Sequence, residues 1–133
     1  IYTSCGTVCP QIERNMAAVF DRLPREKIGS DIVFLSISFD TDRDTPEALE
    51  AYRRHFIDDP NWRTARVPDG DELERLLNTL GVIVIRSDNG DIAHNRAFYL
   101  IDRQGKLAEI MDDTNVDLAT DKIERRIGKG AEA

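Results

Sequence analysis

Residues 1–10 read IYTSCGTVCP, which puts two cysteines, Cys5 and Cys9, directly after a strand-like start. Pro10 indicates a helix beginning there, because the first helical residue has no use for its backbone N–H group. A thiol at a helix N-terminus meets a partial positive charge and ionises more easily. The pattern predicts a cysteine pair at the carboxyl end of a strand, where open α/β sheets place their chemistry.

The composition predicts one globular domain. The chain has 133 residues, of which 41% are hydrophobic and 32% charged, as in ordinary folded domains. A net charge of -7 argues against binding to nucleic acid or to an anionic membrane surface. No apolar run approaches the roughly 20 residues of a membrane span. We expect a single domain over residues 1–128 and a flexible tail over 129–133.

The apolar pattern predicts an α/β fold with a mixed sheet flanked by helices. Early strands that alternate with helices favour parallel pairing, and the turn at residues 102–105 favours a late antiparallel hairpin. Residues 32–38 (IVFLSIS) are expected to form a strand buried on both faces. Ile1 and Tyr2 resemble the end of a first strand, so that strand is expected to be largely missing from this chain. Helices are expected over 10–23, 45–56, 69–80 and 116–127, and strands over 32–38, 62–67, 82–85, 97–101 and 107–111.

Two cysteines at this spacing allow three kinds of chemistry. They can remain inert or form a structural disulfide, they can exchange disulfides with a partner, or they can hold one soft metal ion such as Cu(I) or Zn(II). A zinc site needs three or four protein ligands. The only other strong ligands in the chain are two histidines, and neither stands at zinc-finger spacing.

The two histidines differ in context. His55 follows two arginines on a predicted helix and is expected to be a solvated surface residue. His94 lies in a predicted loop just before the strand at 97–101. Most loop histidines have no special role, but this one would complete a set of two sulfurs and one nitrogen. Such a set suits both reduced and oxidised copper.

An acidic stretch follows the predicted strand at 32–38. Asp40, Asp42 and Asp44 precede Thr45 and Pro46, which predict a helix start. The plain interpretation is a solvated loop whose negative charge favours that helix N-terminus. If Asp40 or Asp44 approaches the cysteines, it would support the site or recognise a partner.

Three motifs in the chain resemble those of a known family. They are TSCGTVCP at residues 3–10, SFDTDRDTPE at 38–47 and HNRAFYLIDRQG at 94–105. In this order and at these separations they resemble the Sco/SenC copper proteins, which have a thioredoxin-like fold. The likeness runs from Cys5 to nearly the last predicted helix.

The resemblance implies a copper metallochaperone. Family members bind copper through two cysteines and a distant histidine, here Cys5, Cys9 and His94. They assist copper-centre assembly in cytochrome c oxidase, so the expected partner is its copper-bearing subunit or another copper chaperone. Members are usually tethered to a membrane and face the bacterial periplasm or the mitochondrial intermembrane space. The anchor of this protein would lie upstream of the chain.

Four positions depart from the family motifs. Gly6 replaces a proline and should loosen the cysteine loop, and Thr41 replaces another proline. Ala93 and Asn95 flank the histidine where the family has aspartate and serine or threonine. Loss of the aspartate is expected to remove an acceptor that would orient the imidazole.

Three other functions remain open. A metal-independent thiol–disulfide oxidoreductase would use Cys5 and Cys9 as its redox pair and would not need His94. A peroxidase would need a base or an arginine beside one thiolate, and Arg96 is the only candidate near the motifs. A binding module would keep the cysteine pair for structure alone.

Overall fold

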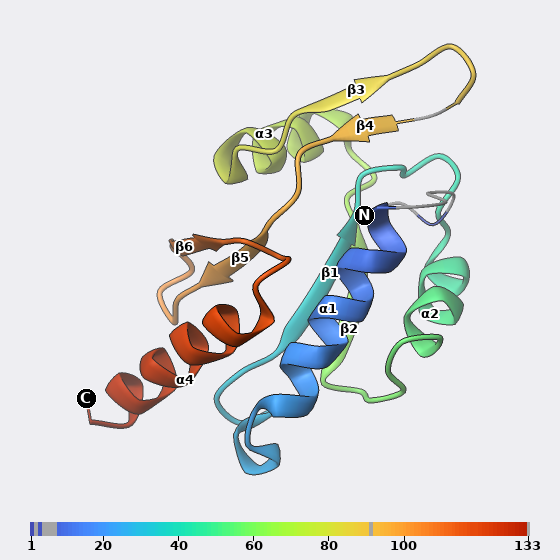
Figure 1. Cartoon of the computed structure of the whole chain (residues 1–133). Coiled ribbons are helices and arrows are strands. Elements are labelled where there is room, and N and C mark those ends of the chain that lie inside the picture. Colours follow the sequence, from blue (N-terminus) through green and yellow to red (C-terminus); the bar gives the residue numbers. More distant parts are fainter. Residues whose placement is uncertain (2, 4–7, 91, 133) are drawn as a thin grey trace.

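Helices and strands alternate over most of the chain (Figure 1). The computed structural model describes residues 1, 3, 8–90 and 92–132, without the side chains of residues 8, 9 and 128–132. In chain order the elements are α1 (Val8–Arg22), η1 (Arg25–Lys27), β1 (Phe34–Ser38), α2 (Pro46–Arg54), β2 (Trp62–Arg66), α3 (Gly70–Leu80), β3 (Val84–Arg86), β4 (Ile92–His94), β5 (Phe98–Ile101), β6 (Leu107–Met111) and α4 (Val116–Glu132).

The predicted starts of α2 and α3 are confirmed by their caps. The hydroxyl of Thr45 accepts the N–H of Ala48 at 3.1 Å, directly before Pro46. The carboxylate of Asp69 accepts two backbone N–H groups in the first turn of α3. Gly81 ends α3 with a φ of +75°, which a residue without Cβ adopts easily. Each cap satisfies backbone groups that the helix itself leaves unpaired.

Parallel and antiparallel strand pairs are both present, as predicted. β1 and β2 are parallel, with Phe34 opposite Trp62, and α2 forms the crossover between them. β5 and β6 form the late antiparallel hairpin, with Phe98 opposite Met111. The mixed α/β fold class expected from the sequence is therefore confirmed.

The prediction missed one strand. β4 pairs antiparallel with β3 and places His94 opposite Val84, so His94 ends a strand and does not lie in a loop. A three-residue strand that contains alanine and histidine gives no alternating apolar signal. Pairing with β3, and not local sequence preference, therefore forms β4.

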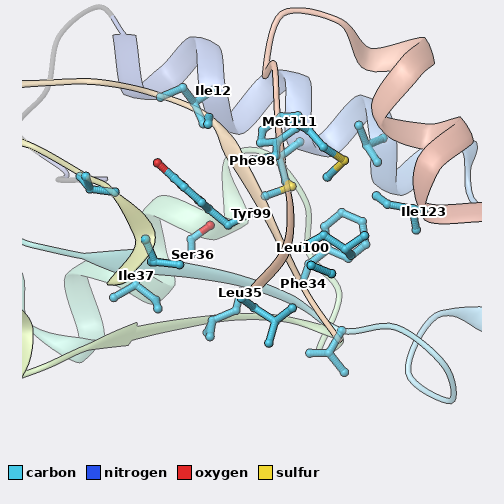
Figure 2. Close-up of a pocket in the computed structure, with 18 of the residues that line it drawn as sticks. Ile12, Phe34, Leu35, Ser36, Ile37, Phe98, Tyr99, Leu100, Met111 and Ile123 are labelled. Atoms are coloured by element: carbon cyan, nitrogen blue, oxygen red, sulfur yellow. The ribbon is translucent and has the colours of Figure 1, made fainter. Parts of the chain in front are cut away.

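A cavity of about 980 Å³ lies between β1 and β5. Figure 2 shows side chains of both strands around it, together with Ile12 of α1 and Ile123 of α4. Within the described residues the strands form three two-stranded sheets. Leu35 lines the cavity and is 49% exposed, so the prediction that β1 is buried on both faces was wrong.

The main core lies where α1 and α4 cover the strands. Phe20 of α1 makes an edge contact with Phe34 and stacks on Trp62, at centroid distances of 5.1 and 6.2 Å. Such aromatic pairs add about 0.5–1.5 kcal/mol each beyond area burial. This cluster fixes α1, and with it the first turn that carries Cys9, against the β1–β2 pair.

The last helix is longer than the sequence suggested. α4 continues to Glu132, past the expected end near residue 127, while the flexibility of residues 129–133 stays a prediction. Across the described residues, none of the helices has both the length and the apolar character to cross a membrane.

Candidate metal centre

The second cysteine belongs to the start of α1. Cys9 is the second residue of the helix, which begins two residues before Pro10. The partial positive charge of the helix N-terminus is therefore close to the Cys9 backbone. The side chain of Cys9 and the whole of Cys5 lie outside the described residues, so the positions of both sulfurs stay predictions.

His94 is the best described of the predicted ligands. Its half-buried ring has Nδ1 at 2.8 Å from the backbone oxygen of Asn95. A carbonyl oxygen can only accept, so Nδ1 carries the proton and the lone pair lies on Nε2. Burial lowers the pKa of His94, the positive charge of Arg96 acts the same way, and the hydrogen bond to the Asn95 oxygen opposes both. At neutral pH the imidazole is therefore in the neutral form that binds metals.

The ring is oriented by its surroundings. The imidazole meets the ring of Phe39 edge-on at a centroid distance of 5.0 Å. The Asn95 side chain accepts the N–H of Ile83 at 2.8 Å and donates to the oxygen of Gly81 at 2.9 Å, which holds the end of β4 against the end of α3. Ala93 offers no side-chain acceptor, and the backbone oxygen of Asn95 supplies one to the imidazole instead.

A direct side-chain contact joins the cysteine helix to the histidine segment. Arg96 donates to the Gln11 side chain at 3.3 Å. Gln11 is two residues after Cys9, and Arg96 is two residues after His94. The Cys9 and His94 backbones are thereby brought into one neighbourhood.

The polypeptide just before the cysteine loop is anchored at Asp44. The Thr3 backbone N–H donates to this carboxylate at 3.1 Å and the Thr3 hydroxyl also donates to it. The hydroxyl of Ser38 donates at 2.6 Å. Asp44 is completely buried, so the interpretation as a solvated loop was wrong for this residue. Three donors compensate the burial of its charge.

The other two aspartates of the acidic stretch behave differently. Asp40 is buried and accepts from Arg43 at 2.6 Å, with Arg86 of β3 nearby at 3.8 Å. Arg43 also donates to the oxygen of Gly90 in the β3–β4 turn. Only Asp42 is exposed, as the plain interpretation predicted. The stretch therefore holds the β3–β4 hairpin, which carries His94, against the end of β1.

Glu13 is a buried acid that the sequence did not single out. It lies one helical turn after Cys9 and is only 1% exposed. The Ser36 hydroxyl donates to it at 3.0 Å and accepts the indole N–H of Trp62 at 3.0 Å. Burial raises the pKa of Glu13 to about 7, against the lowering effect of the Ser36 hydrogen bond. Its spacing from Met16 and Phe20 was the available signal that it shares their buried face.

The two remaining candidates from the sequence, His55 and Arg96, lie in different surroundings. His55 is exposed at the end of α2, as expected for a surface residue. Arg96 forms an ion pair with Asp113 at 2.7 Å, a partner that the sequence did not reveal. Within the described side chains, no three His, Cys, Asp or Glu residues come together as a metal site. The trio of Cys5, Cys9 and His94 falls partly outside those residues and stays a prediction.

The family model SCO1/SenC matches residues 1–128. The chain belongs to the SCO1/SenC family. A SCO1 protein homolog of Bacillus subtilis is 28% identical over 110 residues, which are 80% of this chain and 56% of that protein. The chain thus spans about half the length of this relative.

Solved structures of the family share the fold. A SCO1/SenC family lipoprotein of Bacillus anthracis superposes with a TM-score of 0.83 at 30% identity, over 94% of this chain and 76% of that one. The copper-bound ScoI of Bradyrhizobium japonicum superposes with a TM-score of 0.71 at 25% identity, over 94% and 80%. The thioredoxin-like fold that the sequence motifs implied is therefore confirmed.

Proposed function

We propose that this chain binds one copper ion through Cys5, Cys9 and His94 and delivers it during assembly of the copper centre of cytochrome c oxidase. Its partner would be the copper-bearing subunit or another copper chaperone. The hydrogen bond between Arg96 and Gln11 is the observation that best supports the proposal. It joins the residues that lie two positions after His94 and Cys9. The copper-bound relative from Bradyrhizobium japonicum adds support from the family.

The chemistry of the donor set fits copper. Two thiolates suit Cu(I), and a neutral imidazole suits Cu(II), so the three side chains would hold either state. The bond from Nδ1 of His94 to the Asn95 oxygen puts the lone pair on Nε2. That arrangement is typical of histidine ligands, whose second nitrogen donates to a carbonyl or carboxylate.

The protein's own residues would prepare binding and release. The α1 N-terminus favours the thiolate of Cys9, since its partial charge is positive. Binding then releases the thiol protons to solvent. Transfer to a partner would proceed by ligand exchange, one thiolate at a time. Oxidation of the cysteine pair to a disulfide would remove both sulfur ligands and block loading.

We propose that this domain is held at a membrane. A relative from Bacillus anthracis is a lipoprotein, which fits a domain held at a membrane by a lipid anchor. Its proposed location is the periplasmic side of a bacterial inner membrane or, in a mitochondrial protein, the intermembrane space. Fractionation of cells expressing the full-length protein, with protease added from the periplasmic side, would test this placement.

Anaerobic copper titration of the reduced protein tests the proposal. A one-to-one complex with thiolate–copper absorption is expected. His94→Ala should weaken Cu(II) binding at least tenfold and remove the imidazole nitrogen signal from its spin-resonance spectrum. His55→Ala, at the exposed histidine, serves as the matched control and should change nothing. Unaltered binding in the His94 variant would contradict the proposed ligand set.

A metal-independent thiol–disulfide oxidoreductase is the second candidate, and Glu13 favours it. A buried carboxyl with a pKa of about 7, one turn after Cys9, is suited to exchange protons at neutral pH. One thiolate would attack a partner disulfide, form a mixed disulfide and release one partner thiol. The second cysteine would then attack the mixed disulfide, release the other partner thiol and leave Cys5 and Cys9 joined as a disulfide. This activity should survive His94→Ala and be absent from Cys5→Ser and Cys9→Ser.

A further inference from the structure

Arg96 lies in the short connection between β4 and β5, two residues after His94. Its Nε donates to Oδ2 of Asp113 at 2.7 Å. The Asp113 side chain is 3% exposed and that of Arg96 is 25% exposed. An ion pair shielded from water is more rigid and less weakened by salt than a surface pair.

The same pair reaches the cysteine helix at two points. Arg96 donates through Nη1 to Oε1 of Gln11 at 3.3 Å. The backbone oxygen of Asp113 accepts from the side chain of Asn15 at 2.9 Å. Gln11 and Asn15 are one turn apart on α1, just after Cys9. Arg96, Asp113, Gln11 and Asn15 together form what we call the brace.

We propose that Arg96 is a positioning residue for the metal centre, because the brace holds the His94 segment at a fixed place relative to the first turns of α1. The inference rests on the proposed function, in which His94 and Cys9 bind one ion. A metal ion requires its ligands to meet within narrow limits of distance and angle. The planar guanidinium suits this role because its donors point in fixed directions.

The geometry of the brace is not what stability alone would favour. Nη2 of Arg96 is buried and has no hydrogen-bond partner among the described residues. A buried donor without a partner costs free energy, and such a group in a native structure calls for an explanation such as a functional role. Within the described part of the chain this third nitrogen is left unpaired. Nη1 bonds to Gln11 of α1, and Nε bonds to Asp113, whose backbone oxygen accepts from Asn15 of α1.

A double-mutant cycle tests the role. Arg96→Gln should lower copper affinity about tenfold in the reduced protein. In a His94→Ala background the same change should have little further effect, because Arg96 acts through His94. Arg22→Gln is the matched control: Arg22 pairs with Asp117 of α4 and also ties α1 to α4, but at the opposite end of α1. It should leave copper affinity within about twofold of wild type.

Two further measurements keep the result decisive. In the metal-free protein, Arg96→Gln should speed amide hydrogen exchange in β4 more than Arg22→Gln does. Arg96→Lys keeps the positive charge but lacks the planar guanidinium with its fixed donor directions. This variant should therefore fold and lose part of its copper affinity. Equal affinities of Arg96→Gln, Arg96→Lys and wild type, or additive losses with His94→Ala, would overturn the inference. A wild-type protein that binds no copper would instead overturn the proposed function.

Discussion

Glu13 shows how one side chain can couple folding to pH. Its carboxyl is buried against β1, where the Ser36 hydroxyl donates to it. Burial disfavours the charged form more than this hydrogen bond favours it, so the pKa rises from its ordinary 4.5 to about 7. The folded protein therefore holds a proton that the unfolded chain releases between these two values.

The proton that Glu13 holds in the folded protein makes the stability depend on pH. Between pH 4.5 and 7 the folded state binds more protons than the unfolded state, so Glu13 makes stability fall as pH rises. The full effect is about 3 kcal/mol. Urea unfolding should show that the difference in unfolding free energy between wild type and Glu13→Gln changes by about 3 kcal/mol between pH 4.5 and 7. The exposed control Glu74→Gln should show a constant difference, and a constant difference for Glu13→Gln would refute the assignment.

Asp44 is the residue on which the start of the cysteine loop depends. It accepts from the backbone and hydroxyl of Thr3 and from Ser38. Asp44→Asn replaces one acceptor oxygen by a donor, so a buried donor loses its partner at a cost of about 1–3 kcal/mol. We expect that loss in chemical unfolding, together with weaker copper binding, since Thr3 is two residues before Cys5. Asp42→Asn, on the exposed aspartate of the stretch, should alter neither property.

At the scale of elements, local chemistry predicted some features and not others. The starts of α2 and α3 were predictable because Thr45 and Asp69 satisfy backbone groups within three residues. β4 was not predictable, since its strand character comes from pairing with β3. The role of Asp44 was also hidden, because its partner Thr3 is distant in sequence. Sequence alone made His94 a candidate ligand through its motif, but it did not predict the strand that carries His94.

Asn95 is one of the residues that hold the β3–β4 hairpin in place. The side chain bonds to Ile83 and Gly81, and each hydrogen bond contributes about 1 kcal/mol. Asn95→Ala should therefore speed amide exchange in β3 and β4 and lower stability by about 1–2 kcal/mol. Asn78→Ala, at an exposed position on α3, is the control. Unchanged exchange in the hairpin would show that other contacts hold it.

At the scale of the whole molecule, the cavity between β1 and β5 lies between two parts of the fold that share one hydrophobic core. Figure 1 shows α1 and the β1–β2 pair on one side and β5, β6 and α4 on the other. The sequence pattern predicted both strand pairs but not the cavity between them, since a pattern of apolar residues does not say which strands are neighbours. Contacts such as Arg96 to Gln11 bridge the two sides.

Copper should stabilise the whole molecule if the ion joins Cys9 of α1 to His94 of β4. A ligand that binds only the folded state adds about 2.7 kcal/mol at one hundred times its dissociation constant. Thermal unfolding under argon should therefore shift upward by several degrees when copper is added to the reduced protein at about one hundred times its dissociation constant. The shift should shrink in His94→Ala. A shift of equal size in that variant would mean that His94 does not bind the ion.

X-ray absorption at the copper edge of the loaded, reduced protein most directly tests whether two sulfurs and one imidazole share a single ion. We predict two sulfur scatterers and one histidine nitrogen per copper, with the histidine contribution lost in His94→Ala and one sulfur lost in Cys9→Ser. A copper coordination shell of sulfur alone that His94→Ala leaves unchanged would contradict the proposed ligand set. A shell of oxygen and nitrogen without sulfur would contradict it as well.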